Sequence, residues 1–387
     1  MDKFVYERVC AIALNRVFGF EPRIPLLLID KLGSAQAVFE LPQPELRRIL
    51  GMRAGHYLPL LGKTLLEESE REYEWLSSCG MQFVTCLDTD FPQMLRECED
   101  PPVGIYVRSG SDTSRIFNSR PAISIVGTRD ISAYGKRWCE EIVRTIAGSP
   151  SKPVIVSGLA FGVDVTAHAA ALACALPTIA VIPTGIDEIY PATHSVIAEK
   201  IARSPCSAII TDYPPRTPAG KVNFLRRNRI IAALGDSTIL VESKIHGGGM
   251  MTARLAHGYG RGVFALPGRI DDLRSQGCNS LLGQKIAEPI TSMADLCDTL
   301  GLETYSVRRM KDLTEIVRER FRNDPDLPLI LKTAGAIRRH NGISIDEICG
   351  QEGMAYCDVS RCTGKLECES LISIDLMQQC CIVTKFD

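Results

Sequence analysis

The stretch KVNFLRRNRIIAALG, residues 221–235, concentrates side chains that can hold a polyanion. Its polar and aromatic members are Lys221, Phe224, Arg226, Arg227, Asn228 and Arg229. The apolar residues that follow have the spacing of a buried helical stripe, which places the arginines at or just before a helix N-terminus. That end carries roughly half a unit of positive charge, so the cations need a neutralising partner. A buried carboxylate would serve, and so would a bound phosphate chain.

A second candidate site follows the apolar run AISIVG, residues 122–127. Gly127, Thr128 and Arg129 form the turn before an amphipathic helix, where backbone N–H groups, a hydroxyl and a guanidinium can cradle a phosphate. The G-x-G-x-x-G of dinucleotide sites is absent after this strand, and the P-loop pattern occurs nowhere in the chain. The turn therefore predicts a phosphate cradle without a nicotinamide or P-loop signature.

The next loop, SGLAFGVDVTAH, brings Ser157, Asp164 and His168 together in sequence, a trio that invites a hydrolase interpretation. The G-x-S-x-G of a nucleophile elbow is missing, however. His168 lies one helical turn from Asp164, which favours a local contact between them. We expect Asp164 to be the N-cap of the following helix, with Ser157 and Gly158 at the end of a strand.

Glycines mark two further loops that follow strands. Gly247, Gly248 and Gly249 precede a helix and permit close backbone approach by an anion, and Gly268 closes another strand. None of the loops supplies a convincing base, nucleophile, metal-ligand set or carboxylate pair, so we expect no catalytic residue, metal or cofactor. Phe224 beside cations is instead typical of single-stranded nucleic-acid binding, where a ring stacks on a base for about 1–3 kcal/mol.

The elements expected around these loops form an α/β protein. Short β-rich runs begin near residue 80, separated mostly by helical patterns: MQFVTCL, VGIYVRS, AISIVG, PVIVSG, TIAVIPTG, SAIITDY, STILVES and GVFALPG. Continuous apolar strands that alternate with helices predict a doubly wound, mostly parallel sheet. Ligands of such sheets bind in the loops at the carboxyl ends of the strands, which is where the candidate residues lie.

The flanking regions complete the predicted domain organisation. Residues 1–72 have helical apolar spacing broken by Gly and Pro turns, which predicts SAM-like or helix-hairpin-helix-like modules. Residues 73–302 form the sheet domain and residues 303–327 a charged linker. Residues 328–387 show three helices and a two-strand ribbon, a pattern typical of a winged helix.

The last helix of that winged-helix-like segment has a charge pattern that disfavours DNA contact. Its acidic residues are Asp358, Glu367 and Glu369, against Arg361 and Lys365. Because phosphate contacts need a net positive charge, a protein-interaction or packing role is favoured for this segment.

Composition limits the function further. The 387 residues carry a formal net charge of −2, so a basic site must be a local patch. The N-terminus shows no secretory pattern and no apolar run approaches a membrane span, which predicts a cytoplasmic protein that contacts no membrane. The 15 cysteines are irregularly spaced and predict reduced thiols. The six from Cys349 to Cys381 lack a C-x-x-C pair and predict small buried residues rather than a zinc site.

Taken together, the motifs resemble those of the bacterial DNA-processing proteins DprA/Smf. IVGTRDISAYG, VSGLAFGVDVTAHAAAL, TIAVIPTGIDEIYP, NFLRRNRIIAALGDSTILVES and GVFALPG occur in a similar order and spacing, and the flanking segments match that family's three-part layout. The resemblance implies an extended Rossmann domain that binds single-stranded DNA without sequence preference and forms a homodimer. It also implies delivery of the recombinase RecA onto incoming DNA during natural transformation.

The resemblance assigns roles to residues. It implies that Arg129 and its turn contact phosphates, that Lys221 precedes the base-stacking Phe224, and that Arg227 and Arg229 line the same pocket or brace it through Glu242. The expected DNA-binding set is Gly127, Thr128, Arg129, Ser157, Gly158, Lys221, Phe224, Arg226, Arg227, Asn228, Arg229, Gly247 and Gly248, and the expected structural support is Asp164, Glu242 and Gly268. Phe161 stands where the family often has arginine, which removes one cation from that loop.

Two other functions are open. Nucleoside-monophosphate phosphoribohydrolases also surround a phosphate with glycine turns and arginines, but they carry P-G-G-x-G-T-x-x-E, whereas LPGRIDD has one glycine and lacks that glutamate. A structural adaptor would instead neutralise the arginines internally, for which Asp164, Asp212 and Glu242 are available. Both rank below nucleic-acid binding.

Overall fold

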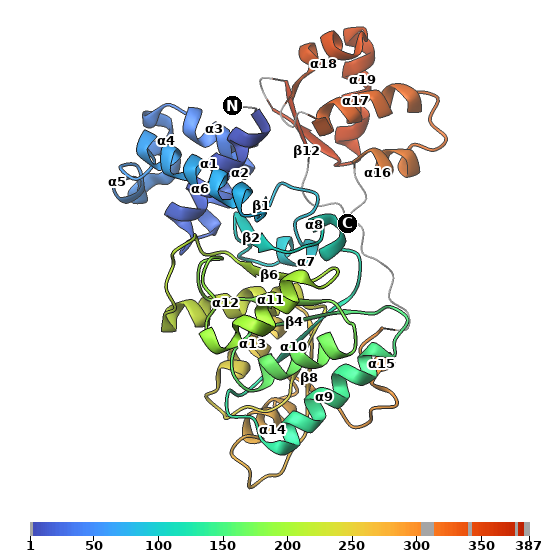
Figure 1. The fold of residues 1–387 in the computed structure, drawn as a ribbon. Coiled ribbons are helices and arrows are strands. Elements are labelled where there is room, and N and C mark those ends of the chain that lie inside the picture. Colours follow the sequence, from blue (N-terminus) through green and yellow to red (C-terminus); the bar gives the residue numbers. More distant parts are fainter. Residues whose placement is uncertain (1–2, 303–312, 340–342, 376–377, 383–387) are drawn as a thin grey trace. The chain divides into compact units, whose positions relative to one another are not determined.

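The computed structural model describes residues 3–302, 313–339, 343–375 and 378–382. It divides into two compact units (Figure 1). The first holds most of the N-terminal helices and a large sheet, and the second holds the C-terminal helices and a small sheet.

The centre of the first unit is a sheet in which nine strands are described, with the order β1-β2-β6-β5-β4-β3-β7-β8-β9. The strands are β1 (Gln82–Thr85), β2 (Gly104–Arg108), β3 (Ala122–Val126), β4 (Val154–Ser157), β5 (Thr178–Val181), β6 (Ala208–Thr211), β7 (Ser237–Leu240), β8 (Gly262–Ala265) and β9 (Glu288–Pro289). From β6 to β9 all neighbours are parallel, while β1 and β2 are added antiparallel at one edge. Every predicted strand is confirmed, and β9 is an additional one.

The strand order reverses direction at β3. The chain builds β4, β5 and β6 outward on one side of β3, and then returns to place β7, β8 and β9 on the other. Such a reversal leaves a crevice outside the carboxyl ends of the two strands at the switch point. For this sheet, the crevice lies between the loops that follow β3 and β7.

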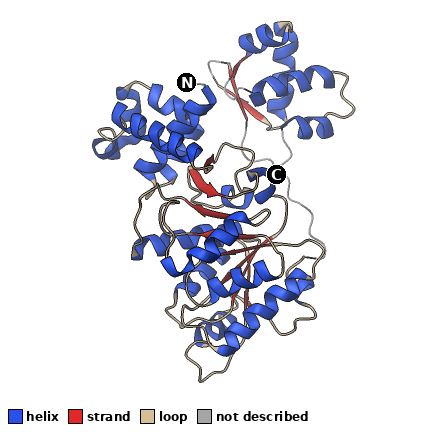
Figure 2. Cartoon of the chain, viewed as in Figure 1, coloured by secondary structure: helices blue, strands red, loops and turns tan. Residues whose placement is uncertain are grey.

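Helices cover both faces of the sheet (Figure 2). One face packs on α9 (Ala133–Ala147) and α10 (Val163–Ala173), and the other on α12 (Lys221–Leu234) and α13 (Gly248–Gly258). The remaining helices around the sheet are α7 (Gln93–Arg96), α8 (Thr113–Ile116), α11 (Ser195–Arg203), α14 (Gln276–Gly283), α15 (Leu296–Thr299) and the 3₁₀ helix Ala192–His194. Because both faces are covered, the parallel strands read as continuous apolar runs.

The N-terminal helices are α1 (Lys3–Phe18), α2 (Arg23–Leu32), α3 (Ala35–Glu40), α4 (Gln43–Leu50), α5 (Ala54–Tyr57) and α6 (Lys63–Ser78), with a 3₁₀ turn at Gly51–Arg53. Glu72 of α6 ties them to the sheet: it accepts from Arg16 of α1 at 2.6 Å and from the hydroxyl of Tyr106 in β2 at 2.6 Å. Burial raises the pKa of Glu72, although both partners oppose the rise. The helices and the sheet are therefore joined by a buried polar contact.

The second unit contains α16 (Leu313–Arg320), α17 (Leu327–Arg339), α18 (Ile345–Glu352) and α19 (Tyr356–Cys368), with strands β10 (Ile343–Ser344), β11 (Ile372–Ile374) and β12 (Gln379–Ile382). Ser344 and Glu347 form a capping box at the start of α18. The three helices and the ribbon predicted here are confirmed. The segment predicted as a linker, 303–327, differs, because α16 buries Leu313 and Val317 in this unit's core. Residues 303–312 of it lie outside the described chain.

The six C-terminal cysteines are only partly buried, contrary to expectation. Cys362 and Cys380 are in the core, whereas Cys357 and Cys368 are exposed. Across the described residues, no group of three or more His, Cys, Asp or Glu side chains is arranged to hold a metal ion. No described helix combines the length and apolar character that crossing a membrane requires.

Candidate nucleic-acid interface

A groove of about 610 Å³ opens at the carboxyl ends of the strands where the order reverses. Its walls are the loop after β3, the start of α10, one face of α12, the loop from β7 into α13, and the loop before α14. The lining residues from the predicted set are Gly127, Thr128, Arg129, Asp164, Phe224, Arg227, Asn228, Gly247 and Gly248. Loops that are far apart in sequence therefore form one site.

Cations lie at the rim of this groove. Arg129 and Lys244 are exposed and line it, as does His246, and no ion pair among the described residues engages them. Lys221, also exposed, is the first residue of α12 and does not itself line the groove, which α12 enters from Phe224 onward. These side chains remain available to phosphates.

Phe224 is the aromatic member of the groove and is half-buried there. The guanidinium of Arg129 lies 4.5 Å from the centre of its ring, and the ring of Tyr190 meets it edge-on at 5.6 Å. Cation–π contacts of this kind contribute about 0.5–2 kcal/mol. The ring is thus held in place beside the cradle after β3.

Three helices that contribute residues to the groove have no side-chain cap, and two of them, α10 and α13, begin at it. The N-caps of α10, α12 and α13 are Gly162, Gly220 and Gly247, which offer no side-chain acceptor. First-turn N–H groups lack intrahelical partners, and each helix N-terminus carries positive partial charge. The groove is therefore suited to anions even apart from its cationic side chains. The prediction that Asp164 would be the N-cap of α10 is wrong, because Asp164 lies within the first turn.

Arg227 is buried rather than open to the groove's solvent. Its Nη1 donates to the Val181 carbonyl at 2.8 Å. Burial lowers the pKa of Arg227 to about 10, although the nearby Asp164 carboxylate acts in the opposite direction. Burial raises the pKa of Asp164. Gly158 makes this possible, since a Cβ there would overlap the Arg227 guanidinium. The Ser157–Gly158 turn is therefore enclosed packing and does not line the groove.

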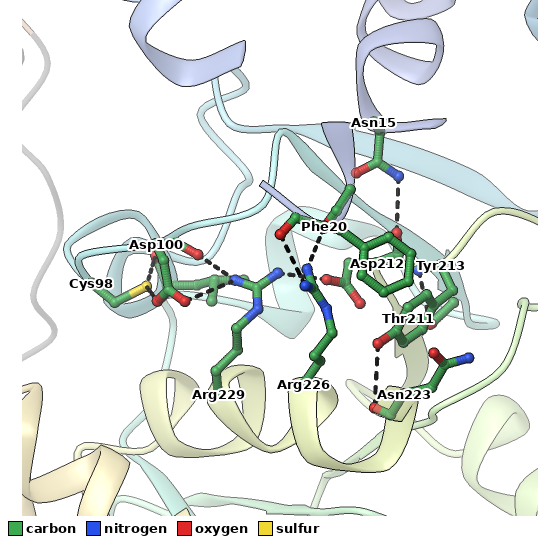
Figure 3. Close-up of polar contacts among 12 residues, drawn as sticks. Asn15, Phe20, Cys98, Asp100, Thr211, Asp212, Tyr213, Asn223, Arg226 and Arg229 are labelled. Atoms are coloured by element: carbon green, nitrogen blue, oxygen red, sulfur yellow. Dashed lines mark hydrogen bonds and ion pairs between the residues drawn. The ribbon is translucent and has the colours of Figure 1, made fainter. Parts of the chain in front are cut away.

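Arg226 and Arg229 do not line the groove, and their guanidinium groups contact protein acceptors instead (Figure 3). Arg226 donates to the carbonyls of Phe20 and Gly19 at 2.9 and 2.5 Å, just past the end of α1, and stacks on the Phe20 ring at 4.2 Å. Arg229 pairs with the buried Asp212 carboxylate at 2.5 Å. Both residues were expected at the DNA site. The reason for the difference is that α12 begins at Lys221, so the arginines fall inside the helix and radiate around its axis.

Glu242 does not brace the arginines. Its side chain accepts from the backbone N–H of Ser132 at 2.9 Å and from the Ser132 hydroxyl at 2.5 Å, and its carbonyl accepts from the N–H of Thr128 at 2.7 Å. Glu242 thereby fixes the turn after β3 and the start of α9. One backbone N–H of the expected phosphate cradle is consequently already occupied. Gly268 is close-packed against Ser275.

The Ser157, Asp164 and His168 trio does not form a hydrolytic site. The Ser157 hydroxyl is fully buried and donates to the Ile125 carbonyl at 2.6 Å. His168 Nδ1 contacts the Thr178 hydroxyl at 2.7 Å, so the expected contact with Asp164 is replaced. Burial, assisted by the charge of Arg227, lowers the pKa of His168 to about 3. An imidazole of such low basicity, in a site where the serine hydroxyl donates to a backbone carbonyl instead, cannot act as the base for that serine.

Several lining residues were absent from the predicted set, among them Lys244, His246, Leu273 and Gln276. Lys244 and His246 directly precede the glycine turn, so their place in the chain was a usable signal. Leu273 and Gln276 belong to the loop before α14, and the sequence offers no pattern that points to them.

The sequence profile of the family described as DNA recombination-mediator protein A matches residues 82–301, from β1 past β9. The chain belongs to this family. It is 37% identical to the DNA processing protein DprA of Streptococcus pneumoniae over 210 residues, which cover 54% of this chain and 71% of that one. It is 36% identical to Protein Smf of Synechocystis over 220 residues, which span about half of that protein, 54%.

Two solved structures of DNA processing protein A share this fold. The X-ray structure of DprA from Streptococcus pneumoniae gives a TM-score of 0.61 at 28% identity and covers 76% of this chain and 97% of that one. The structure from Helicobacter pylori, described as showing a single-stranded DNA binding mode, gives 0.52 at 31% identity and covers 58% and 97%. The groove residues, from Val126 to Gln276, lie within the part of the chain that the family profile matches.

Proposed function

We propose that the groove binds single-stranded DNA without sequence preference. The observation that carries this proposal is the union, in one cavity, of exposed cations, an aromatic ring and the N-termini of α10 and α13, both capped by glycine. Cations that follow a backbone while rings stack on bases are the chemistry of single-strand binding. Membership of the family and the single-stranded DNA binding mode described for the Helicobacter pylori relative support the same function.

The roles follow the positions of the side chains. Arg129, Lys221 and Lys244 contact phosphates, aided by the main chain at Gly127, Gly247 and Gly248 and by the Thr128 hydroxyl. Phe224 stacks on a base. Arg226 and Arg229 hold α12 in position instead, because their hydrogen-bonding groups are directed to protein acceptors. Arg227 supports the floor of the groove together with Asp164.

This is a binding site rather than a catalytic one in our proposal. The carboxylates of Asp130 and Asp164, which line the groove, are both engaged: Asp130 pairs with Arg274 at 2.8 Å, and Asp164 lies beside Arg227. A phosphoribohydrolase needs a free acid or base near the sugar. The arrangement therefore favours DNA over the nucleotide-hydrolysing alternative.

The wider proposal is that the chain is a homodimer, formed through an extended Rossmann domain, that protects incoming single strands and loads RecA onto them. The N-terminal helices would be a SAM-like module and the second unit a winged-helix-like one. Lys365 of α19 is bound to Asp324 and Asp326 at 2.7 and 2.9 Å, and Arg361 also pairs with Asp326. Since its cations are neutralised internally, α19 is better suited to a protein than to DNA. Light scattering and RecA filament assembly on coated strands test these assignments.

The groove itself is tested by fluorescence anisotropy of labelled oligonucleotides across a salt series. We expect single strands of different sequence to bind alike and more tightly than duplexes. Arg129→Glu and Lys221→Glu should each weaken binding and flatten the log–log salt dependence by about 0.7 for every phosphate that is no longer neutralised. Arg203→Glu is the matched control. Arg203 is exposed at the C-terminus of α11, which lies at the amino ends of the strands, whereas the groove lies at their carboxyl ends. Unchanged binding by the double variant would contradict the proposal.

A further inference from the structure

The side chain of Asn228 is unusual among the groove residues. It is 9% exposed and lines the cavity. Across the described residues no hydrogen bond of its carboxamide is found. A carboxamide has two donors and an acceptor with two lone pairs, and the Asn228 nitrogen and oxygen are not among the buried polar atoms that lack a partner, so they are open to the groove. A carboxamide that faces the groove and forms no hydrogen bond with the described protein is available to a ligand.

Helix geometry places Asn228 next to Phe224. Residues four apart on a helix lie on the same face, with about 5–6 Å between their Cβ atoms. Both residues line the groove, with Ile231 a further turn along the same face. A base stacked on the Phe224 ring therefore presents its edge within reach of the Asn228 carboxamide. Arg129, which covers the same ring, is exposed and is the residue that we propose contacts a phosphate.

We propose that Asn228 forms hydrogen bonds with the edge of the base that stacks on Phe224. This inference rests on the proposed single-strand function and deepens it. A carboxamide rotated by 180° exchanges its donor for its acceptor, so one residue can satisfy edges of opposite character. The groove then requires a base at this position without selecting which one. Water satisfies the amide in the free protein at little enthalpic cost, and the base replaces it.

The test compares wild type, Asn228→Ala and Asn228→Asp on dT, dC and abasic oligonucleotides of equal length. Asn228→Ala should weaken binding to dT and dC by roughly five- to thirtyfold, the loss expected for one or two hydrogen bonds, and leave the abasic strand unaffected. Asn228→Asp keeps the shape but only accepts hydrogen bonds. Because cytosine offers an amino donor where thymine offers the O4 acceptor, the dC to dT affinity ratio should rise in this variant.

Three results would overturn the inference. Equal losses of affinity on abasic and base-containing strands would assign Asn228 to the backbone or to packing, and an unchanged affinity would remove it from the site. A constant dC to dT ratio in Asn228→Asp would exclude contact with the base edge. Thermal melting of each variant checks folding. If wild type itself bound no single strand, the proposed function would fail, which separates that outcome from failure of the Asn228 assignment alone.

Discussion

The two sides of α12 have different roles: one lines the groove, and the other anchors the helix to the rest of the first unit. At about 100° per residue, Phe224 and Asn228 share the side that lines the groove, while Arg226 and Arg229 lie on the opposite side. The opposite side holds the N-terminal helices and the end of β6, where carbonyls and a carboxylate accept from both arginines. A cluster of cations in sequence is therefore divided by helix geometry into anchors and ligand-binding groups.

The comparison also explains how so much positive charge is tolerated near one helix start. Arg229 is neutralised by Asp212, and Arg227 lies beside Asp164. Arg226 contacts the carbonyl end of α1, where partial negative charge favours a cation. Internal partners thus account for the three arginines, and Lys221 on α12 and Arg129 nearby retain their charge for a ligand.

Among changes on the anchoring side of α12, we expect Arg229→Met to have the largest effect. It leaves the Asp212 carboxylate buried without its partner, since each side chain of the pair is less than a tenth exposed. We expect the free energy of unfolding to fall by about 3–5 kcal/mol, measured by urea denaturation. The folded fraction should still bind single strands normally. The control is Arg203→Met, at an exposed ion pair, which should change the free energy of unfolding by less than about 0.5 kcal/mol. An equally small change for Arg229→Met would show that Arg229 does not anchor α12.

The groove side is broken by Phe224→Ala. Loss of the stacking ring should reduce single-strand affinity by about 1–3 kcal/mol with little effect on the salt slope, because the same phosphates remain neutralised. Anisotropy at several salt concentrations measures both quantities. Val222→Ala is the control, since Val222 is exposed on the same helix but does not line the groove. Equal affinities for the two variants would rule out stacking on Phe224.

The smallest expected effect, that of Arg226→Gln, tests whether Arg226 belongs to the anchoring side of α12 or to the DNA-contacting side. Arg226→Gln should lower stability by about 1 kcal/mol, through loss of the charge at the end of α1. Its salt slope should match that of wild type, unlike the slope of Arg129→Glu. A slope reduced by about 0.7 would instead return Arg226 to the DNA-contacting group.

The strands and the loops after them could be predicted because their signals are local. Buried parallel strands read as apolar runs, and the switch-point rule places their loops together, which is how Gly127, Phe224 and Gly247 were brought to one site. The partners of the arginines could not be predicted in this way. Arg226 meets Gly19 across 207 positions of the chain, a contact that depends on how the N-terminal helices pack on the sheet domain.

The start of α12 was the other source of error. Gly220 gives no capping signal, so the apolar residues from Ile230 suggested a helix that begins after the arginines. Once the helix is known to begin at Lys221, its periodicity alone separates Phe224 from Arg226. Glu242 was likewise misassigned because its partner, Ser132, lies 110 positions away.

The stack of Arg129 on Phe224 has a consequence for selectivity by length. In the free protein Arg129 covers the Phe224 ring, so a base that binds must share the ring with Arg129 or displace it. The net binding free energy at this position is therefore the difference between the base–ring stack and the arginine–ring stack. A single nucleotide, which offers one such exchange and one phosphate, would gain little. A long strand also reaches the other rim cations, so we expect occupancy of the groove to depend on polymer length rather than on the identity of any monomer.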